Sequence, residues 1–119
     1  LDAKLLRGGL VDIEFIVHFL QLRDRTAFHP ALSTAIGDLV AGGLLPDRLS
    51  EHFALLARVL VAARLLAPDR EAPSPAACEA LARAAGQLDY PALLQALIEA
   101  RQGTAQVWAE LFGQPLEIA

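Results

Sequence analysis

Residues 45–66 read LPDRLSEHFALLARVLVAARLL, and the periodicity of this stretch indicates the fold class. Apolar side chains recur at spacings of three and four, the period of one face of an α-helix. They are Leu49, Phe53, Leu56, Leu60 and Ala63. Pro46 and Asp47 are typical of a first helical turn, and Pro68 follows the last turn. The pattern therefore predicts a long helix that starts at 45–47 and ends at Leu66.

Segments on both sides of this stretch predict further helices, at about Leu10 to Asp24, Ala31 to Ala41, Pro75 to Gly86 and Pro91 to Phe112. Ser74 and Asp89 are expected to cap the last two of them, and Gly42-Gly43 to end the second. The proline-rich residues 67–75 predict an exposed loop. Period-2 alternation typical of strands is missing from the sequence. Residues 1–119 thus predict one domain, an all-α antiparallel bundle of four to five helices.

The first and last of these helices differ in their patterns. The first is apolar nearly all the way round, except for a polar stripe of Glu14, His18, Gln21 and Arg25, which predicts a central position in the bundle. The last predicts an inner face made of Leu93, Leu94, Leu97, Ile98, Val107, Trp108 and Leu111. Gly103 interrupts this helix, and a helical glycine costs up to about 1 kcal/mol relative to alanine.

Composition limits the class of protein. Hydrophobic residues make up 55% of the 119 residues, and the formal charge is −4. The basic residues are scattered, which argues against a nucleic-acid-binding surface. Arg58 and Arg64 interrupt the most apolar stretch, so we expect no membrane span and no membrane partner. The single cysteine, Cys78, cannot form an internal disulfide and is expected to be a small buried apolar residue. Together with the lack of a signal peptide, these features predict a cytoplasmic protein.

The chain contains no methionine and opens on Leu1-Asp2-Ala3-Lys4. Removal of a tag or N-terminal trimming would explain this. We favour the interpretation that the sequence is a piece of a longer protein.

Local motifs for catalysis are not evident. His18, His29 and His52 have no i, i+4 pairing on one helix, so we predict no metal site, and Glu14 with His18 is expected to form a simple surface pair. There is no Walker loop, no GxGxxG, and no serine or cysteine nucleophile with an evident base. We therefore assign no catalytic residue and no cofactor to this chain by itself.

One cluster remains, at residues 4–15, KLLRGGLVDIEF. Gly8 and Gly9 precede a helix whose first N–H groups are open and carry partial positive charge. Lys4 and Arg7 stand just upstream, so these four residues are candidates for a phosphate-binding or cleft-edge site. The alternative is an ordinary helix start with a structural role only.

Two acidic residues follow the glycines. Asp12 and Glu14 are two positions apart, about 200° around a helix, so they cannot jointly hold one metal ion. Asp12 is suited to capping the helix or to pairing with Lys4 or Arg7, whereas Glu14 points elsewhere. Their role is therefore either structural or cleft-facing.

The segment KLLRGGLVDIEFIVHFLQL, residues 4–22, resembles a pattern of bacterial glutamine synthetase adenylyltransferases: K-x-x-x-G-G, then D/E-I-E-F, then Q-x-x-Q-L. That family usually has glutamine at the position of His18, which weakens any role for this histidine. A looser resemblance covers the rest of the chain, through His29-Pro30, AGGLL at 41–45 and VWAELFG at 107–113. The closing segment favours the C-terminal, adenylylating half of the family. Uridylyltransferases of the P-II protein carry a related GGLRDI stretch, but the IEF continuation fits the adenylyltransferases better.

The resemblance implies an accessory helical domain of an enzyme that transfers AMP from ATP to a tyrosine of glutamine synthetase, in the regulation of nitrogen assimilation. The elements that hold ATP and magnesium in the family, a Gly-Ser and an Asp-x-Asp, would lie upstream of this chain. Implied partners are the upstream nucleotidyltransferase domain, glutamine synthetase and the P-II protein. Two alternatives stay open: a helical module that docks a partner without any part in chemistry, and the helical domain of a uridylyltransferase-like enzyme.

Overall fold

The structure is a computed structural model that describes residues 8–66 and 74–116 of the chain. It contains five helices: α1 (Leu10–Asp24), α2 (Leu32–Ala41), α3 (Asp47–Leu66), α4 (Pro75–Ala84) and α5 (Tyr90–Phe112). Within these described ranges there is no strand. The prediction of an all-α bundle of four to five helices is confirmed, and the helix bounds differ from the expected ones by at most two residues.

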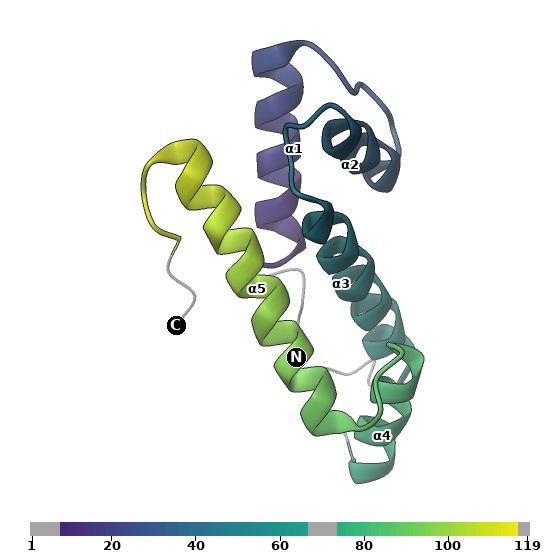
Figure 1. The fold of residues 1–119 in the computed structure, drawn as a ribbon. Coiled ribbons are helices and arrows are strands. Elements are labelled where there is room, and N and C mark those ends of the chain that lie inside the picture. The colour runs from purple at the N-terminus through teal and green to yellow at the C-terminus, as the bar shows by residue number, and fades with distance from the viewer. Residues whose placement is uncertain (1–7, 67–73, 117–119) are drawn as a thin grey trace.

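The two longest helices, α3 and α5, lie side by side and run in opposite directions (Figure 1). α4 packs on both at one end of the pair, while α1 and α2 lie toward the other end. α3 contacts each of the other four helices. The helix at the centre of the bundle is therefore α3, and the expectation that α1 is central is wrong.

Helix caps form where the sequence indicates them. The Oγ atom of Ser74 accepts a hydrogen bond from the backbone N–H of Ala77 at 3.2 Å, with Pro75 in the first turn of α4. The Oδ1 atom of Asp89 accepts one from Ala92 N–H at 2.8 Å. Most of the loop expected at 67–75 lies outside the described residues, which resume at Ser74. These caps fix the starts of α4 and α5 by local chemistry alone.

One hydrophobic core joins all five helices. It includes Ile13, Ile16 and Leu20 from α1, Ile36 and Leu39 from α2, Leu49, Leu56 and Val59 from α3, Leu81 from α4, and Leu93, Leu97 and Val107 from α5. Two residues expected on the inner face of α5, Leu94 and Ile98, are instead 38% and 44% exposed. Their spacing of four residues puts both on one side of α5.

No helix in the described ranges has both the length and the apolar content required to cross a membrane.

Candidate functional site

The turn that precedes α1 consists of Gly8 and Gly9, and both are buried. Gly8 has φ +78°, in the left-handed region that glycine adopts without steric cost. Gly9 is the N-cap of α1, with an ordinary φ of −88° and no side-chain cap. Of the two glycines, only Gly8 therefore has a backbone conformation that favours glycine.

Gly8 also makes a close tertiary approach. A Cβ atom placed on it would lie 2.6 Å from the backbone carbonyl oxygen of Arg101 and 2.9 Å from the Arg101 Cα atom, on α5. Backbone atoms cannot move aside as the end of a side chain can. The missing side chain of Gly8 thus allows the turn before α1 to rest directly on the middle of α5.

Asp12 closes this turn from inside the protein. Its Oδ2 atom accepts a hydrogen bond from the backbone N–H of Gly8 at 2.7 Å, and the residue is only 7% exposed. Two roles were expected for Asp12, capping and pairing with Lys4 or Arg7. The described residues show the capping hydrogen bond. The Gly8 N–H, one of the donors considered for an anion, already serves a carboxylate. Phosphate at this N–H would have to displace the buried negative charge of Asp12.

Of the remaining candidates of the cluster, Lys4, Arg7 and Glu14, only Glu14 lies within the described residues. Lys4 and Arg7 lie outside the described residues, so neither pairing with Asp12 nor a place at a cleft is described for them. Glu14 is half-buried on a different side of α1 from the buried Asp12, as the helical geometry predicts.

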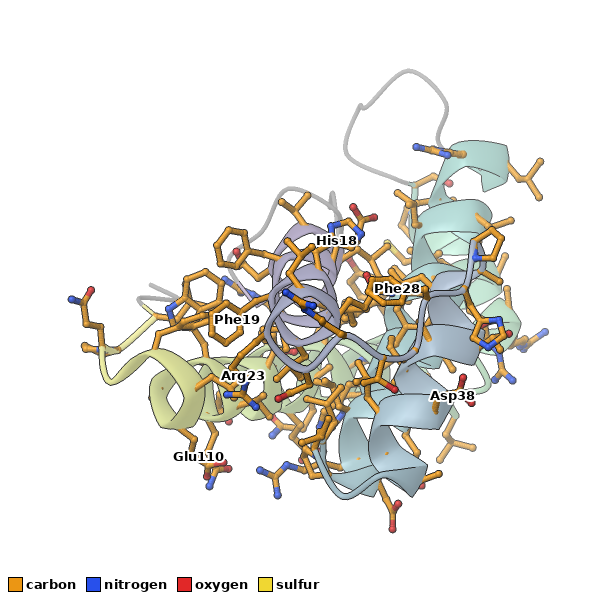
Figure 2. All side chains as sticks on the ribbon, turned by 90° about the horizontal axis from the view of Figure 1, so that it is seen from above. His18, Phe19, Arg23, Phe28, Asp38 and Glu110 are labelled. Atoms are coloured by element: carbon orange, nitrogen blue, oxygen red, sulfur yellow. The ribbon has the colours of Figure 1, made fainter. Side chains whose placement is uncertain are left out.

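The three histidines lie apart, on α1, before α2 and on α3. Among the described residues no group of three or more His, Cys, Asp or Glu side chains could hold a metal ion. His18 is exposed, and in Figure 2 it points to the side of α1 away from α5. No hydrogen bond or ion pair joins His18 to Glu14 in the described part of the chain, so the expected surface pair is not formed. The Nε2 atom of His29 instead lies 2.8 Å from Oδ2 of Asp38 on α2, a contact that sequence analysis missed.

His52 on α3 occupies space that Gly103 leaves open on α5. A Cβ atom on Gly103 would clash with the His52 imidazole, whose Cδ2 atom would lie 2.7 Å away. Burial lowers the pKa of His52 from its usual value and the positive charge of Arg48 lowers it further, against the opposing effect of Glu51 and Glu99. The imidazole is therefore neutral near pH 7. Gly103 is not merely a weak point in α5, because it makes room for this side chain.

The contact between His52 and Gly103 predicts that the Gly103→Ala substitution changes the stability of the chain in opposite directions when His52 is present and when it is replaced by alanine. Gly103→Ala should destabilise the native chain by about 1–2 kcal/mol, because the new methyl group overlaps the imidazole. In a His52→Ala background, Gly103→Ala should stabilise by about 0.5–1 kcal/mol through helix propensity. Urea unfolding followed by circular dichroism measures both. Gly37, in α2 with nothing within 4 Å of its Cβ position, is the matched control and should gain stability on mutation to alanine. The same sign in both backgrounds would contradict the contact.

A surface pocket of about 460 Å³ adjoins His52. α3, α5 and the turn between α4 and α5 line it, with Glu51, Arg58, Gln87 and Glu99 as its other polar residues. Arg58 reaches over the turn, where its Nη1 atom would lie 3.8 Å from a Cβ atom on Gly86. The pocket presents both charges and a neutral imidazole, but no serine, threonine or cysteine that could act as a nucleophile.

An aromatic cluster links α1 to the C-terminal half of α5. The rings of Phe15 and Trp108 lie 5.2 Å apart, and those of Phe19 and Phe112 lie 4.8 Å apart. Phe112 also lies 4.6 Å from Trp108, and the Arg23 guanidinium stands 5.5 Å from the Phe19 ring centre. Because the second pair on each helix is one turn beyond the first, α1 and α5 run in the same direction.

The outer face of α1 is a row of four exposed residues, Val11, Phe15, His18 and Leu22, which we call the α1 stripe. The three apolar members are 44%, 53% and 75% exposed, respectively. The sequence predicted a helix that is apolar nearly all the way round and central in the bundle, and this pattern does not show which side of the helix lacks a neighbour. The spacing of four, three and four that defines the row was nevertheless present in the sequence.

Comparison of the chain with protein-family models, with curated proteins and with solved structures gave no match. The resemblance to adenylyltransferases therefore stays a prediction.

Proposed function

We propose that this chain is the accessory helical domain of a nucleotidyltransferase that resembles glutamine synthetase adenylyltransferase. The full-length enzyme would be cytoplasmic and would transfer AMP from ATP, with magnesium, to a tyrosine of glutamine synthetase. The chemistry would belong to the upstream domain, because the acidic elements that hold the metal in the family have no counterpart in this chain.

The observation that carries the proposal is the construction of the Gly-Gly turn within the family-like segment 4–22. Gly8 rests on the backbone of Arg101, so this glycine of the motif forms a rigid joint between the turn before α1 and the middle of α5. A rigid joint is useful where a bundle must keep a fixed orientation to a neighbouring domain. It would hold Arg7, the residue next to it in sequence, at the edge of that domain's cleft.

The guanidinium of an arginine such as Arg7 forms a planar fork suited to phosphate or carboxylate oxygens. Charge develops on the phosphoryl group during AMP transfer, and a fixed cation stabilises it best when it needs no reorganisation. In this proposal Lys4 and Arg7 supply the positive charge. Gly8, Gly9 and Asp12 form the turn that would position these cations.

The test is the Arg7→Ala substitution in the full-length enzyme. Steady-state adenylylation of glutamine synthetase should fall by one to three powers of ten, equal to about 1.4–4 kcal/mol of transition-state stabilisation. The melting temperature should hardly change, because Arg7 precedes the helix and the core. Arg7→Lys should not restore the rate, since an ammonium group cannot form the bidentate contact.

Arg64→Ala is the matched control, because Arg64 is an exposed cation on α3 far along the chain from the joint. It should leave the rate unchanged. If Arg7→Ala also leaves the rate unchanged and costs 1 kcal/mol or less in stability, the motif is only structural.

A second candidate function is a helical module that docks a partner protein and takes no part in chemistry. Two observations favour it: the buried capping role of Asp12 and the exposure of the α1 stripe. This second function predicts that Arg7→Ala keeps the full adenylylation rate and that Phe15→Glu loses partner binding, whereas the accessory-domain function predicts a reduced rate for Arg7→Ala. We retain the accessory domain as the main proposal because only that function accounts for the family-like segment.

A further inference from the structure

The α1 stripe is an apolar row that the described part of the bundle leaves uncovered on one helix. Val11, Phe15, His18 and Leu22 follow one face of α1, and Phe15 joins them to the partly buried rings of Trp108 and Phe112 on α5. A helix that is apolar nearly all the way round, with one narrow polar stripe, is ordinarily covered on all its apolar sides. Contiguous apolar patches of this kind mark interaction surfaces.

We propose that the α1 stripe is a self-association face, through which two copies of this chain pair with their α1 helices antiparallel about a two-fold axis. The proposal is independent of the main proposed function, since it concerns the chain alone and requires neither ATP nor glutamine synthetase. It assigns to a second copy the face that the second candidate function would assign to a different partner protein.

The spacing of the stripe is self-complementary. Its intervals of four, three and four are symmetric about the midpoint between Phe15 and His18. An antiparallel second copy centred there puts Val11 of each chain against Leu22 of the other, and Phe15 of each against His18 of the other. Every member of the stripe thus meets another member, as an isologous interface requires.

Charge also favours a second copy. The stripe contains no Asp, Glu, Lys or Arg, so two identical faces meet without repulsion. Glu14 borders the stripe on the same side as His18, and neither has a hydrogen bond or ion pair within the described ranges. In the antiparallel arrangement, Glu14 of one chain falls beside His18 of the other, where the carboxylate can accept the imidazole N–H.

The apolar area is adequate for a dimer of ordinary size. The exposed parts of Val11, Phe15 and Leu22, with the accessible edges of Trp108 and Phe112, offer on the order of 300–500 Å². A standard-size interface buries about 800 Å² per partner, somewhat more than half of it non-polar. The stripe and the adjoining rings therefore supply most of the apolar share.

The test is sedimentation equilibrium of the 119-residue chain across the micromolar range. We expect a monomer–dimer equilibrium that saturates at the dimer. Phe15→Glu and Leu22→Glu should each weaken dimerisation at least tenfold, with circular dichroism checking that the helical content is kept. Leu88→Glu is the matched control, because Leu88 is 88% exposed and lies away from the stripe, before α5. It should have no effect.

A charge exchange tests the antiparallel register. His18→Glu should weaken the dimer by placing a carboxylate beside Glu14 of the second copy, and adding Glu14→Lys should restore it. The proposal is overturned by a chain that stays monomeric throughout the range, or by growth beyond a dimer, which indicates a non-symmetric contact. The proposal is also overturned if Leu88→Glu weakens dimerisation as much as the stripe variants do, or if adding Glu14→Lys to His18→Glu does not restore dimerisation. Kinetics of Arg7→Ala are unaffected by any of these outcomes.

Discussion

Gly8→Ala should destabilise the chain by roughly 2–5 kcal/mol. Two costs act together at this position. A side chain at φ +78° is in the left-handed region, which costs about 1–2 kcal/mol for a non-glycine residue. The new Cβ atom would in addition lie 2.6 Å from the Arg101 carbonyl oxygen, and such overpacking typically costs 1–3 kcal/mol. Urea unfolding followed by circular dichroism gives the total.

Gly43→Ala separates these two costs. Gly43 has nearly the same φ, +77°, but nothing lies within 4 Å of its Cβ position. It should lose only the conformational part, about 1–2 kcal/mol. Equal losses at Gly8 and Gly43 would contradict the close approach between the turn and α5, and with it the rigid joint on which the proposed function rests.

Leu56→Ala should cost about 2–5 kcal/mol, because it opens a cavity where α3 faces the other helices. Leu56 is 1% exposed and belongs to the shared core. Alanine is a strong helix former, so the loss cannot be attributed to helix propensity. Chemical denaturation at constant pH and temperature measures it.

Leu65→Ala is the matched control on the same helix. Leu65 is 77% exposed, so its truncation should change stability by no more than about 0.5 kcal/mol. A comparable loss at both positions would mean that the core is not organised around α3. A loss below about 1 kcal/mol at Leu56 would lead to the same conclusion.

The helices and their caps were predictable from the sequence because they depend on neighbours within one or two turns. The spacing of four and three residues between Leu49, Phe53 and Leu56 defines one face of a helix, whatever the tertiary structure around that helix. Ser74 and Asp89 cap N–H groups three residues ahead in the chain, so no tertiary information is required. The capping role of Asp12 was one of two sequence-based alternatives for the same local reason.

The candidate site was only partly predictable. The sequence identified the Gly-Gly pair but not which glycine is left-handed, because that choice depends on how the turn meets α5. From the sequence, Gly103 was interpreted as a weak point of its helix. The His52 imidazole, which fills the space beside Gly103, comes from another helix and is not visible in the local pattern. The His29–Asp38 contact joins a loop to a helix that folds back beside it, which a single-helix pattern does not show.

By itself the sequence determined five helices, their caps, an apolar periodicity sufficient for one core, and a Gly-Gly motif suited to a helix start. Only the tertiary structure decided that α3 is central, that Gly8 rests on α5, and that α1 leaves one apolar face uncovered. The physical reason is that helical hydrogen bonds and caps link residues close in the chain, whereas packing is chosen among faces of similar hydrophobicity. An apolar side of α1 has the same sequence signature whether another helix covers it or not.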